Sequence, residues 1–341
     1  SNLGELVEAG DRGAAVTAMA EGAAAIVRRL HADGRLHGIA GMGGSGGSSL
    51  IARAMRELPI GVPKLLVSTM ASGDVSSFVG ESDVAMMYSV VDIAGINALS
   101  APILSNAAAA VAAMARAHER YTGPAKTRPL VGVTMYGTTT PCIEHARPVL
   151  EGAGFELLVF HATGAGGRSM ESLMQSGFIT AAFDVTTTEL MDEVAGGTLT
   201  AGPDRLEAAG SLGLPQVVSV GAYDQITFTP PDAVPAGYRT RTTYAHNPSI
   251  TLVRSNAAEA DQFGRLMADK LNAARGPVTL FVPLRGASSY AVSGSVFYDP
   301  DADHALVSSL RANVEPPVEL VEVDTDINAP AFGIAMARRL I

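Results

Sequence analysis

The sequence is poor in cysteine and in positive charge, and each shortage excludes a class of protein. Its 341 residues include one cysteine, Cys142, which excludes a disulfide framework and a thiolate metal cluster within one chain and fits a reducing, cytoplasmic setting. The chain has 24 Lys and Arg against 34 Asp and Glu, a formal net charge of −10. Because such a chain repels a phosphate backbone, we expect neither nucleic acid nor an anionic membrane as a partner.

Long hydrophobic runs are also missing. Hydrophobic residues make up 47% of the chain, but alanine supplies much of this fraction and no stretch is long enough to span a bilayer. The alanine-rich stretch 107–117 is short and carries Arg116. The chain opens with Ser1-Asn2 and an acidic segment rather than a signal-peptide pattern. We therefore expect a soluble protein without a membrane span.

What the sequence does contain is a regular alternation of strand and helix patterns. The predicted strands are 36–40, 64–69, 84–91, 130–135, 156–160, 179–184, 216–220, 278–282 and 318–323, with an extended segment at 249–254. The predicted helices are 12–32, 49–58, 97–120, 141–151, 168–175, 188–194, 257–275, 303–311 and one that starts at Ala329. Alternation of this kind predicts the α/β class, with parallel sheets covered by helices.

The length and one linker predict two domains. A chain of 341 residues exceeds one typical core. Residues 122–129 are polar and hold two prolines and one glycine, which is typical of a linker, and a new strand and helix series begins after them. We therefore predict two doubly wound, Rossmann-like parallel-sheet domains, at residues 1–122 and 123–341.

A glycine-rich segment after the first strand is the main candidate for a binding site. Five glycines occupy seven positions from Gly41 to Gly47, between a strand and a helix. Such a turn exposes backbone N–H groups beside the positive end of a helix, an arrangement that attracts phosphate. The segment lacks the lysine of a P-loop and the acidic residue of a dinucleotide site, and a tight packing turn is the alternative. The predicted phosphate-binding residues are Gly43, Gly44, Ser45, Gly46, Gly47 and Ser48.

A second glycine-rich segment follows the predicted strand 156–160. Gly164, Gly166 and Gly167 again lie between a strand and a helix, and are followed by the cation Arg168. Arg168 could clamp a phosphate or carboxylate, and His161 at the strand end could donate to one or transfer a proton, which makes both candidate catalytic residues. As structural alternatives, His161 is a hydrogen-bonded strand-end residue and Arg168 pairs with Glu171 one turn later.

Polar loops after two neighbouring strands add weaker candidates. Ligands in such sheets bind at the carboxyl ends of the strands, so Thr138, Thr139 and Thr187 are predicted to hydrogen-bond phosphate or substrate. Asp184 and Glu189 could bind magnesium or a hydroxyl group, which makes Asp184 a third catalytic candidate; helix-start chemistry is the alternative.

Other loops and the remaining histidines carry less information. Arg241 and His246 could reach an anion or another domain, and Arg285, after the strand 278–282, could supply a further anion contact. The histidines outside these loops are scattered without i,i+4 pairs, which argues against zinc, and no metal-ligand residues are assigned.

Four longer stretches carry a resemblance to a known family. Residues 43–48, 89–97, 160–171 and 240–248 resemble the ATP-binding domain family typified by the N-terminal half of the tomato mosaic virus resistance protein, whose bacterial members are catalogued as an uncharacterised protein family. The resemblance covers essentially the whole chain. It implies a two-domain α/β fold, a homodimer and ATP as the ligand, with or without Mg²⁺. Family members begin with an additional strand and helix carrying a Gly-Thr-x-Asp-Thr-Lys-Gly-like segment, and we expect this chain to start after it.

The sequence therefore predicts a cytoplasmic nucleotide-binding protein whose phosphates lie on residues 43–48, with residues 161–168 completing the pocket or binding a second ligand. Three classes of function remain open. The protein could be an ATP-dependent enzyme acting on a small carboxylate or phosphate, or a nucleotide-gated interaction module. It could also be an enzyme that acts on a small phosphorylated or carboxylate substrate without nucleotide.

Overall fold

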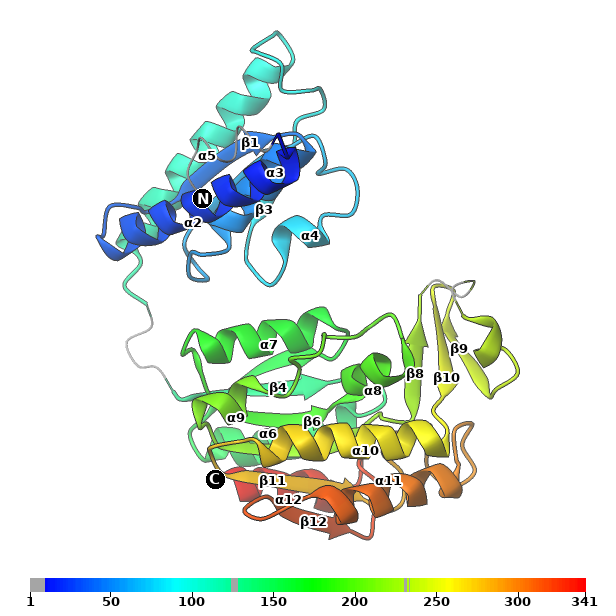
Figure 1. The fold of residues 1–341 in the computed structure, drawn as a ribbon. Coiled ribbons are helices and arrows are strands. Elements are labelled where there is room, and N and C mark those ends of the chain that lie inside the picture. The colour runs from blue at the N-terminus through cyan, green and yellow to red at the C-terminus, as the bar shows by residue number, and fades with distance from the viewer. Residues whose placement is uncertain (1–9, 124–127, 230–231, 233) are drawn as a thin grey trace. The chain divides into compact units, whose positions relative to one another are not determined.

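The structure is a computed structural model that describes residues 10–123, 128–229, 232 and 234–341 (Figure 1). The chain divides into two compact units, Ser1–Lys126 and Thr127–Ile341, and each is described by itself. Half of the predicted linker, residues 124–127, lies outside the described residues, as does the opening of the chain. None of the described helices combines the length and the apolar character needed to cross a membrane.

The first unit is a three-stranded parallel sheet with helices on both faces. Its strands, in the order β1-β2-β3, are β1 (Ile39–Gly43), β2 (Lys64–Ser68) and β3 (Ala85–Tyr88). Its helices are α2 (Arg12–Ala32), α3 (Ser45–Met55), α4 (Ser76–Val79) and α5 (Ser100–Arg120). Side chains of β2 alternate between the faces, so Leu66 packs with Met55 of α3 while Leu65 and Val67 pack with Ala107 of α5.

The second unit is built on a six-stranded parallel sheet. Its strands are β4 (Leu130–Met135), β5 (Glu156–His161), β6 (Ile179–Thr186), β7 (Gln216–Gly221), β11 (Val278–Pro283) and β12 (Glu319–Val323), in the order β12-β11-β7-β6-β4-β5. Strand β4 pairs with both β5 and β6, so the strands that follow it in the sequence are added on both sides of it. The gap between the carboxyl ends of β4 and β6 is the topological switch point, where such sheets bind ligands.

Helices cover both faces of this sheet (Figure 1). They are α6 (Thr140–Gly152), α7 (Ala165–Gln175), α8 (Thr188–Ala195), α9 (Ala208–Leu212), α10 (Ala257–Asn272), α11 (Pro300–Asn313) and α12 (Pro330–Leu340). On one face Phe281 packs with Phe332 of α12, and on the other Leu280 packs with Phe263 of α10 and Leu306 of α11. Alternate residues of one strand thus supply two cores, which explains why the strands read as continuous hydrophobic runs.

A small antiparallel sheet in the second unit was not predicted. It contains β8 (Gln225–Phe228), β9 (Thr243–Asn247) and β10 (Ile250–Arg254), in the order β8-β10-β9, and precedes α10 with the 3₁₀ turn η2 (Ala236–Tyr238) before β9. The sequence indicated only an extended segment at 249–254, because β8 is short and directly follows β7. The α/β class and the two parallel sheets covered by helices are confirmed.

Among the helices that begin earlier than predicted, two begin inside a glycine-rich segment. Helix α3 starts at Ser45 rather than at residue 49, and α7 starts at Ala165 rather than at residue 168. Glycine is a poor helix former, so the pattern indicated loops. Packing overrides that preference: a Cβ on Gly43 would lie 2.9 Å from the Cα of Gly47, and one on Gly166 would lie 1.9 Å from the carbonyl oxygen of His161. The two glycine-rich segments predicted as binding loops therefore form the first turns of helices.

Candidate functional site

The first glycine segment, residues 43–48, joins β1 to α3 and presents unpaired backbone donors. Gly44 is the N-cap residue, and the first helical bond runs from the Ser48 amide to the Gly44 carbonyl, at 2.8 Å. Within the described part of the chain, the amides of Ser45, Gly46 and Gly47 donate to no protein acceptor. Ser45 and Gly47 are exposed to solvent. Three N–H groups at the positive end of a helix form an anion-binding geometry.

Two side chains that the sequence reasoning missed lie beside this segment. The Nη2 atom of Arg12, in the first turn of α2, lies 3.7 Å from the position that a Cβ on Gly46 would take. The hydroxyl of Thr69, just after β2, lies 3.7 Å from the corresponding position on Gly44. Among the described residues Arg12 has no ion-pair partner. Thr69 could have been found as the end of a predicted strand, whereas no pattern brings Arg12 to this helix.

Ser48, one of the predicted phosphate-binding residues, has its side chain bonded within the protein. Its side chain is fully buried, and its hydroxyl contacts the Ser68 hydroxyl at 2.7 Å and donates to the Gly43 carbonyl at 3.2 Å. These contacts join the first turn of α3 to β2. The anion-binding geometry of the segment therefore consists of backbone N–H groups, with Ser48 fixing the turn that presents them.

In the second glycine segment, residues 164–168, two amides are paired with one carboxylate of the protein. The amides of Gly164 and Gly167 donate to Oε1 of Glu189, at 2.6 and 3.0 Å. Glu189 is fully buried at the start of α8. The segment does hold a negatively charged oxygen, and that oxygen belongs to the same chain. Contact with a phosphate, as predicted for Gly164 and Gly167, would require Glu189 to be displaced.

Arg205 pairs with Glu189 and with two further carboxylates. Its guanidinium donates to Asp184 at 2.6 and 2.8 Å, to Glu189 at 2.7 Å and to Glu171 at 3.4 Å, and its side chain has no exposed area. Although burial lowers the pKa of Arg205, these carboxylates raise it well above its ordinary value. The cation beside the predicted Asp184–Glu189 pair is thus Arg205. In the described ranges, no three His, Cys, Asp or Glu side chains are grouped so as to hold a metal ion.

The other two catalytic candidates lie at the edge of this network. His161 ends β5, is exposed, and stacks its ring on Tyr136 with 5.4 Å between centroids. Burial raises the pKa of the Tyr136 hydroxyl, and the carboxylates of Asp192 and Asp224 raise it further. Arg168 donates from Nη1 to the Thr200 carbonyl at 3.2 Å. Catalysis by His161 or Arg168 stays a prediction.

The three predicted threonines are buried and bonded to protein groups. Thr138 accepts from Gln225 at 2.9 Å, Thr139 contacts the Thr186 hydroxyl at 2.8 Å, and Thr187 donates to the Ser219 carbonyl at 2.9 Å. None is more than 4% exposed. They fix the carboxyl edge of the sheet, and contact with a phosphate would require these partners to be exchanged.

A buried acid beyond β7 was also missed. Asp224 is fully buried and accepts from the Ser288 hydroxyl at 2.8 Å, and burial raises its pKa. Its Oδ1 atom and the Oε1 atom of Gln225 have no protein donor within the described residues. The only signal was position, because both residues closely follow a predicted strand.

Cys142 cannot act as a nucleophile at neutral pH, because burial raises the pKa of its thiol to about 12.

Two family models match the chain. The N-terminal domain of the uncharacterised protein family UPF0261 matches residues 1–120, and the C-terminal domain of the same family matches residues 128–341. These matches fall on either side of the division between the two units.

Individual relatives span bacteria and a plant. A UPF0261 protein of Clostridium tetani is 47% identical over 342 residues, covering 100% of this chain and 84% of the relative. One of Rhizobium meliloti is 45% identical, covering 95% of this chain and 80% of the relative. The ToMV resistance protein Tm-1(GCR237) of Solanum lycopersicum is 40% identical over 311 residues, covering 89% of this chain but 41% of that protein.

Among solved structures, the esterase domain of a Rhodothermus marinus protein matches with a TM-score of 0.35 and 13% identity, over 64% of this chain and 87% of that one. A similarity at this level does not extend to activity.

Proposed function

This chain belongs to the uncharacterised protein family UPF0261, and we propose that it binds ATP through the first glycine segment, at the start of α3. One observation carries the proposal: the amides of Ser45, Gly46 and Gly47 have no acceptor among the described protein groups, and two of these three residues are exposed. Helix N-terminal amides attract phosphate through directed N–H groups and the positive end of the helix dipole.

Arg12 supplies the positive charge that this segment lacks in its own sequence. A guanidinium binds phosphate oxygens in a planar, charge-assisted geometry. In a chain of net charge −10, such local groups must outweigh the repulsion of an anionic ligand. The position of Arg12 beside Gly46 therefore supports a phosphate as the ligand.

Exposed apolar side chains at the same sheet edge support a nucleotide rather than phosphate alone. Met42 near the end of β1, Met70 after β2 and Val90 after β3 are 51%, 40% and 54% exposed. Val90 has a φ of 65°, rare for a β-branched residue and typical of strained ligand sites. Binding sites combine apolar surface with a few directed polar groups, and an adenine base would use this surface.

Replacing Ser45 by proline tests the proposal with little cost to the fold. Ser45 is the first helical residue and follows the extended Gly44, so proline fits there and removes an N–H that makes no helical bond. Ser45→Ala keeps the N–H and removes the hydroxyl. We expect Ser45→Pro to weaken ATP binding roughly tenfold in calorimetry, with Ser45→Ala close to the parent protein.

Ligand variation separates the nucleotide from its alternatives. ATP should bind more tightly than inorganic triphosphate, and adenosine should not bind measurably, with each ligand titrated in the presence and absence of Mg²⁺. Arg12→Gln should weaken ATP and triphosphate by similar factors. Equal affinity for ATP and triphosphate would instead favour a substrate phosphate without a base. Unchanged ATP affinity in both Ser45→Pro and Arg12→Gln would contradict the placement of the site. Phosphate release would then distinguish an ATPase from a binding module.

A further inference from the structure

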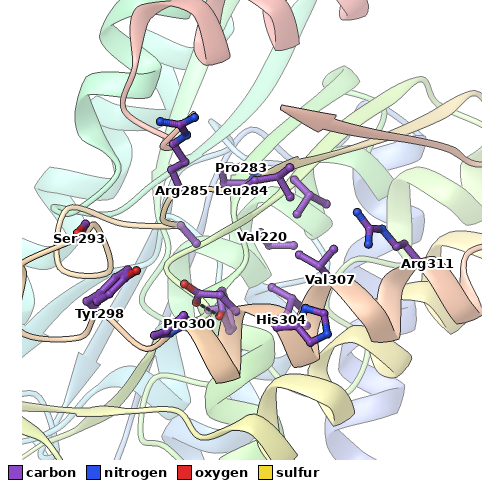
Figure 2. Close-up of a pocket in the computed structure, with 15 residues that line it drawn as sticks. Val220, Pro283, Leu284, Arg285, Ser293, Tyr298, Pro300, His304, Val307 and Arg311 are labelled. Atoms are coloured by element: carbon purple, nitrogen blue, oxygen red, sulfur yellow. Dashed lines mark hydrogen bonds between the residues drawn. The ribbon is translucent and has the colours of Figure 1, made fainter. Parts of the chain in front are cut away.

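A separate pocket of about 440 Å³ opens in the second unit, at the carboxyl ends of β7 and β11. Its walls come from the end of β7, the segment that follows β11 and one face of α11. Figure 2 shows His304, Val307 and Arg311 projecting from α11, with Tyr298 before this helix and Leu284 after β11. The volume falls in the range of small-molecule sites, and its position follows the rule for ligands of parallel sheets.

The apolar surface of this pocket comes from three side chains of its lining. Val220, Val282, Ala287 and Leu306 also line it but are at most 3% exposed. Leu284 and Tyr298 are 39% and 49% exposed, and Val307 is half-buried, so these three present hydrocarbon and aromatic surface to a ligand. The pocket suits a ligand with a hydrocarbon or aromatic body.

Two arginines and a histidine lie beside this apolar surface. Arg311 and His304 lie seven residues apart on one face of α11, and Arg285 follows β11. Arg311 pairs with Glu322 at 2.6 Å, and Arg285 pairs with Asp324 at 2.6 Å. Both arginine side chains are more than half exposed, and exposed pairs of this kind contribute little to stability. A carboxylate on a ligand can therefore share or replace these partners at small cost.

The one carboxylate among the lining residues, Asp303, already has an arginine partner that does not line the pocket. Asp303 accepts from the guanidinium of Arg254 at 2.9 Å and from the Tyr223 hydroxyl. Arg254 is 5% exposed and also donates to the Phe297 carbonyl at 2.7 Å, so its position is fixed. The groups that can meet an anionic ligand are thus Arg285 and Arg311, each of which is paired with one carboxylate outside the lining.

From this apolar surface and the arginines beside it, we infer that this pocket binds a monocarboxylate with an apolar body. The carboxylate lies against Arg311 and His304, and the body lies against Leu284, Tyr298 and Val307. The inference is independent of the nucleotide proposal, because every residue that carries it belongs to the second unit.

Matched ligands, titrated into the full chain, test separately the recognition of the carboxylate and of the apolar body. Hexanoate and hexanamide share one body but differ in charge, while acetate carries the charge without the body. We expect hexanoate to bind at least about tenfold more tightly than either, measured by calorimetry or ligand-observed NMR. Equal binding of hexanoate and hexanamide would overturn the role of the arginines, and no binding of hexanoate would overturn the inference.

Substitutions at the rim give effects of opposite sign. Arg311→Gln should weaken hexanoate binding roughly tenfold, whereas Glu322→Gln releases Arg311 from its partner and should strengthen it. Neither change should alter the binding of hexanamide. Weakening by both substitutions would indicate a disturbed structure rather than charge recognition and would count against the inference.

A blocking variant locates the ligand. His304 is exposed at the mouth of the pocket, so His304→Trp should abolish hexanoate binding while leaving the fold intact. Ala312→Trp on the same helix is the control, because Ala312 is exposed and does not line the pocket. Hexanoate binding that survives His304→Trp would place the ligand elsewhere.

Discussion

The two glycine segments start helices in the same way and differ in what their amides meet. Each follows a parallel strand and each needs glycine for close packing. In the first, the amides of the opening turn have no acceptor among the described protein groups and Arg12 stands beside them. In the second, Glu189 accepts from two amides and is neutralised by Arg205. A glycine-rich helix start is therefore an anion-binding device whose anion can be a side chain of the same protein.

The largest expected difference between the two glycine segments is in how much the unfolding free energy falls when the arginine beside each segment is replaced. Arg205→Met would leave Asp184 and Glu189 buried without a counter-charge, so we expect a loss of about 3–5 kcal/mol in unfolding free energy. Urea unfolding followed by circular dichroism measures it. Arg12→Gln, the matched change at the first segment, should leave stability nearly unchanged. Similar stability of the two variants would mean that the buried network does not hold the second segment.

A second expected effect is a change of the unfolding free energy with pH, which arises on α8, the helix that carries Glu189. Burial raises the pKa of Asp192, one turn after Glu189 on α8, to about 7, against about 3.9 in an unfolded chain. Between these values the folded state keeps a proton that the unfolded state has released. The contribution of Asp192 to stability is therefore full below about pH 4 and is lost as the pH rises to about 7.

Asp192→Asn tests this contribution. The variant should show a flatter decline of unfolding free energy between about pH 4 and pH 7 than the parent protein. Glu171 and Asp224 also have raised pKa values and add a slope of the same sign in both proteins, so the comparison between them is the measurement. An identical slope would show that Asp192 titrates alike in the folded and unfolded states.

The smallest expected effects on stability come from glycine to alanine substitutions in the two segments, and these two effects have opposite signs. A Cβ on Gly167 would lie 2.1 Å from Oε2 of Glu189, so Gly167→Ala should cost about 1–3 kcal/mol. A Cβ on Gly46 would meet only the end of Arg12, at 3.7 Å, so Gly46→Ala should gain up to about 1 kcal/mol from helix propensity. Thermal unfolding of both variants measures the contrast, and destabilisation by Gly46→Ala would show that the first segment is as tightly packed as the second.

Much of the fold could be predicted because its signals are local. Helix α2 and strand β4 have the predicted bounds, since hydrophobic periodicity and end signals lie within each element. The helix starts at Ser45 and Ala165 were missed because close packing overrides the low helix propensity of glycine. In the candidate site, the glycine segments could be predicted, but Arg12 and Arg205 could not. Each reaches its segment from a part of the chain that no local pattern connects to it.

By itself, the sequence determined the α/β class, the parallel sheets and the two places where strand and helix meet through glycine. Only the tertiary structure decided that one of these places is paired with Glu189, which lies 25 and 22 residues along the chain from the amides it accepts. The physical reason is that backbone donors are fixed by local conformation, whereas the acceptor that meets them is fixed by how distant segments pack.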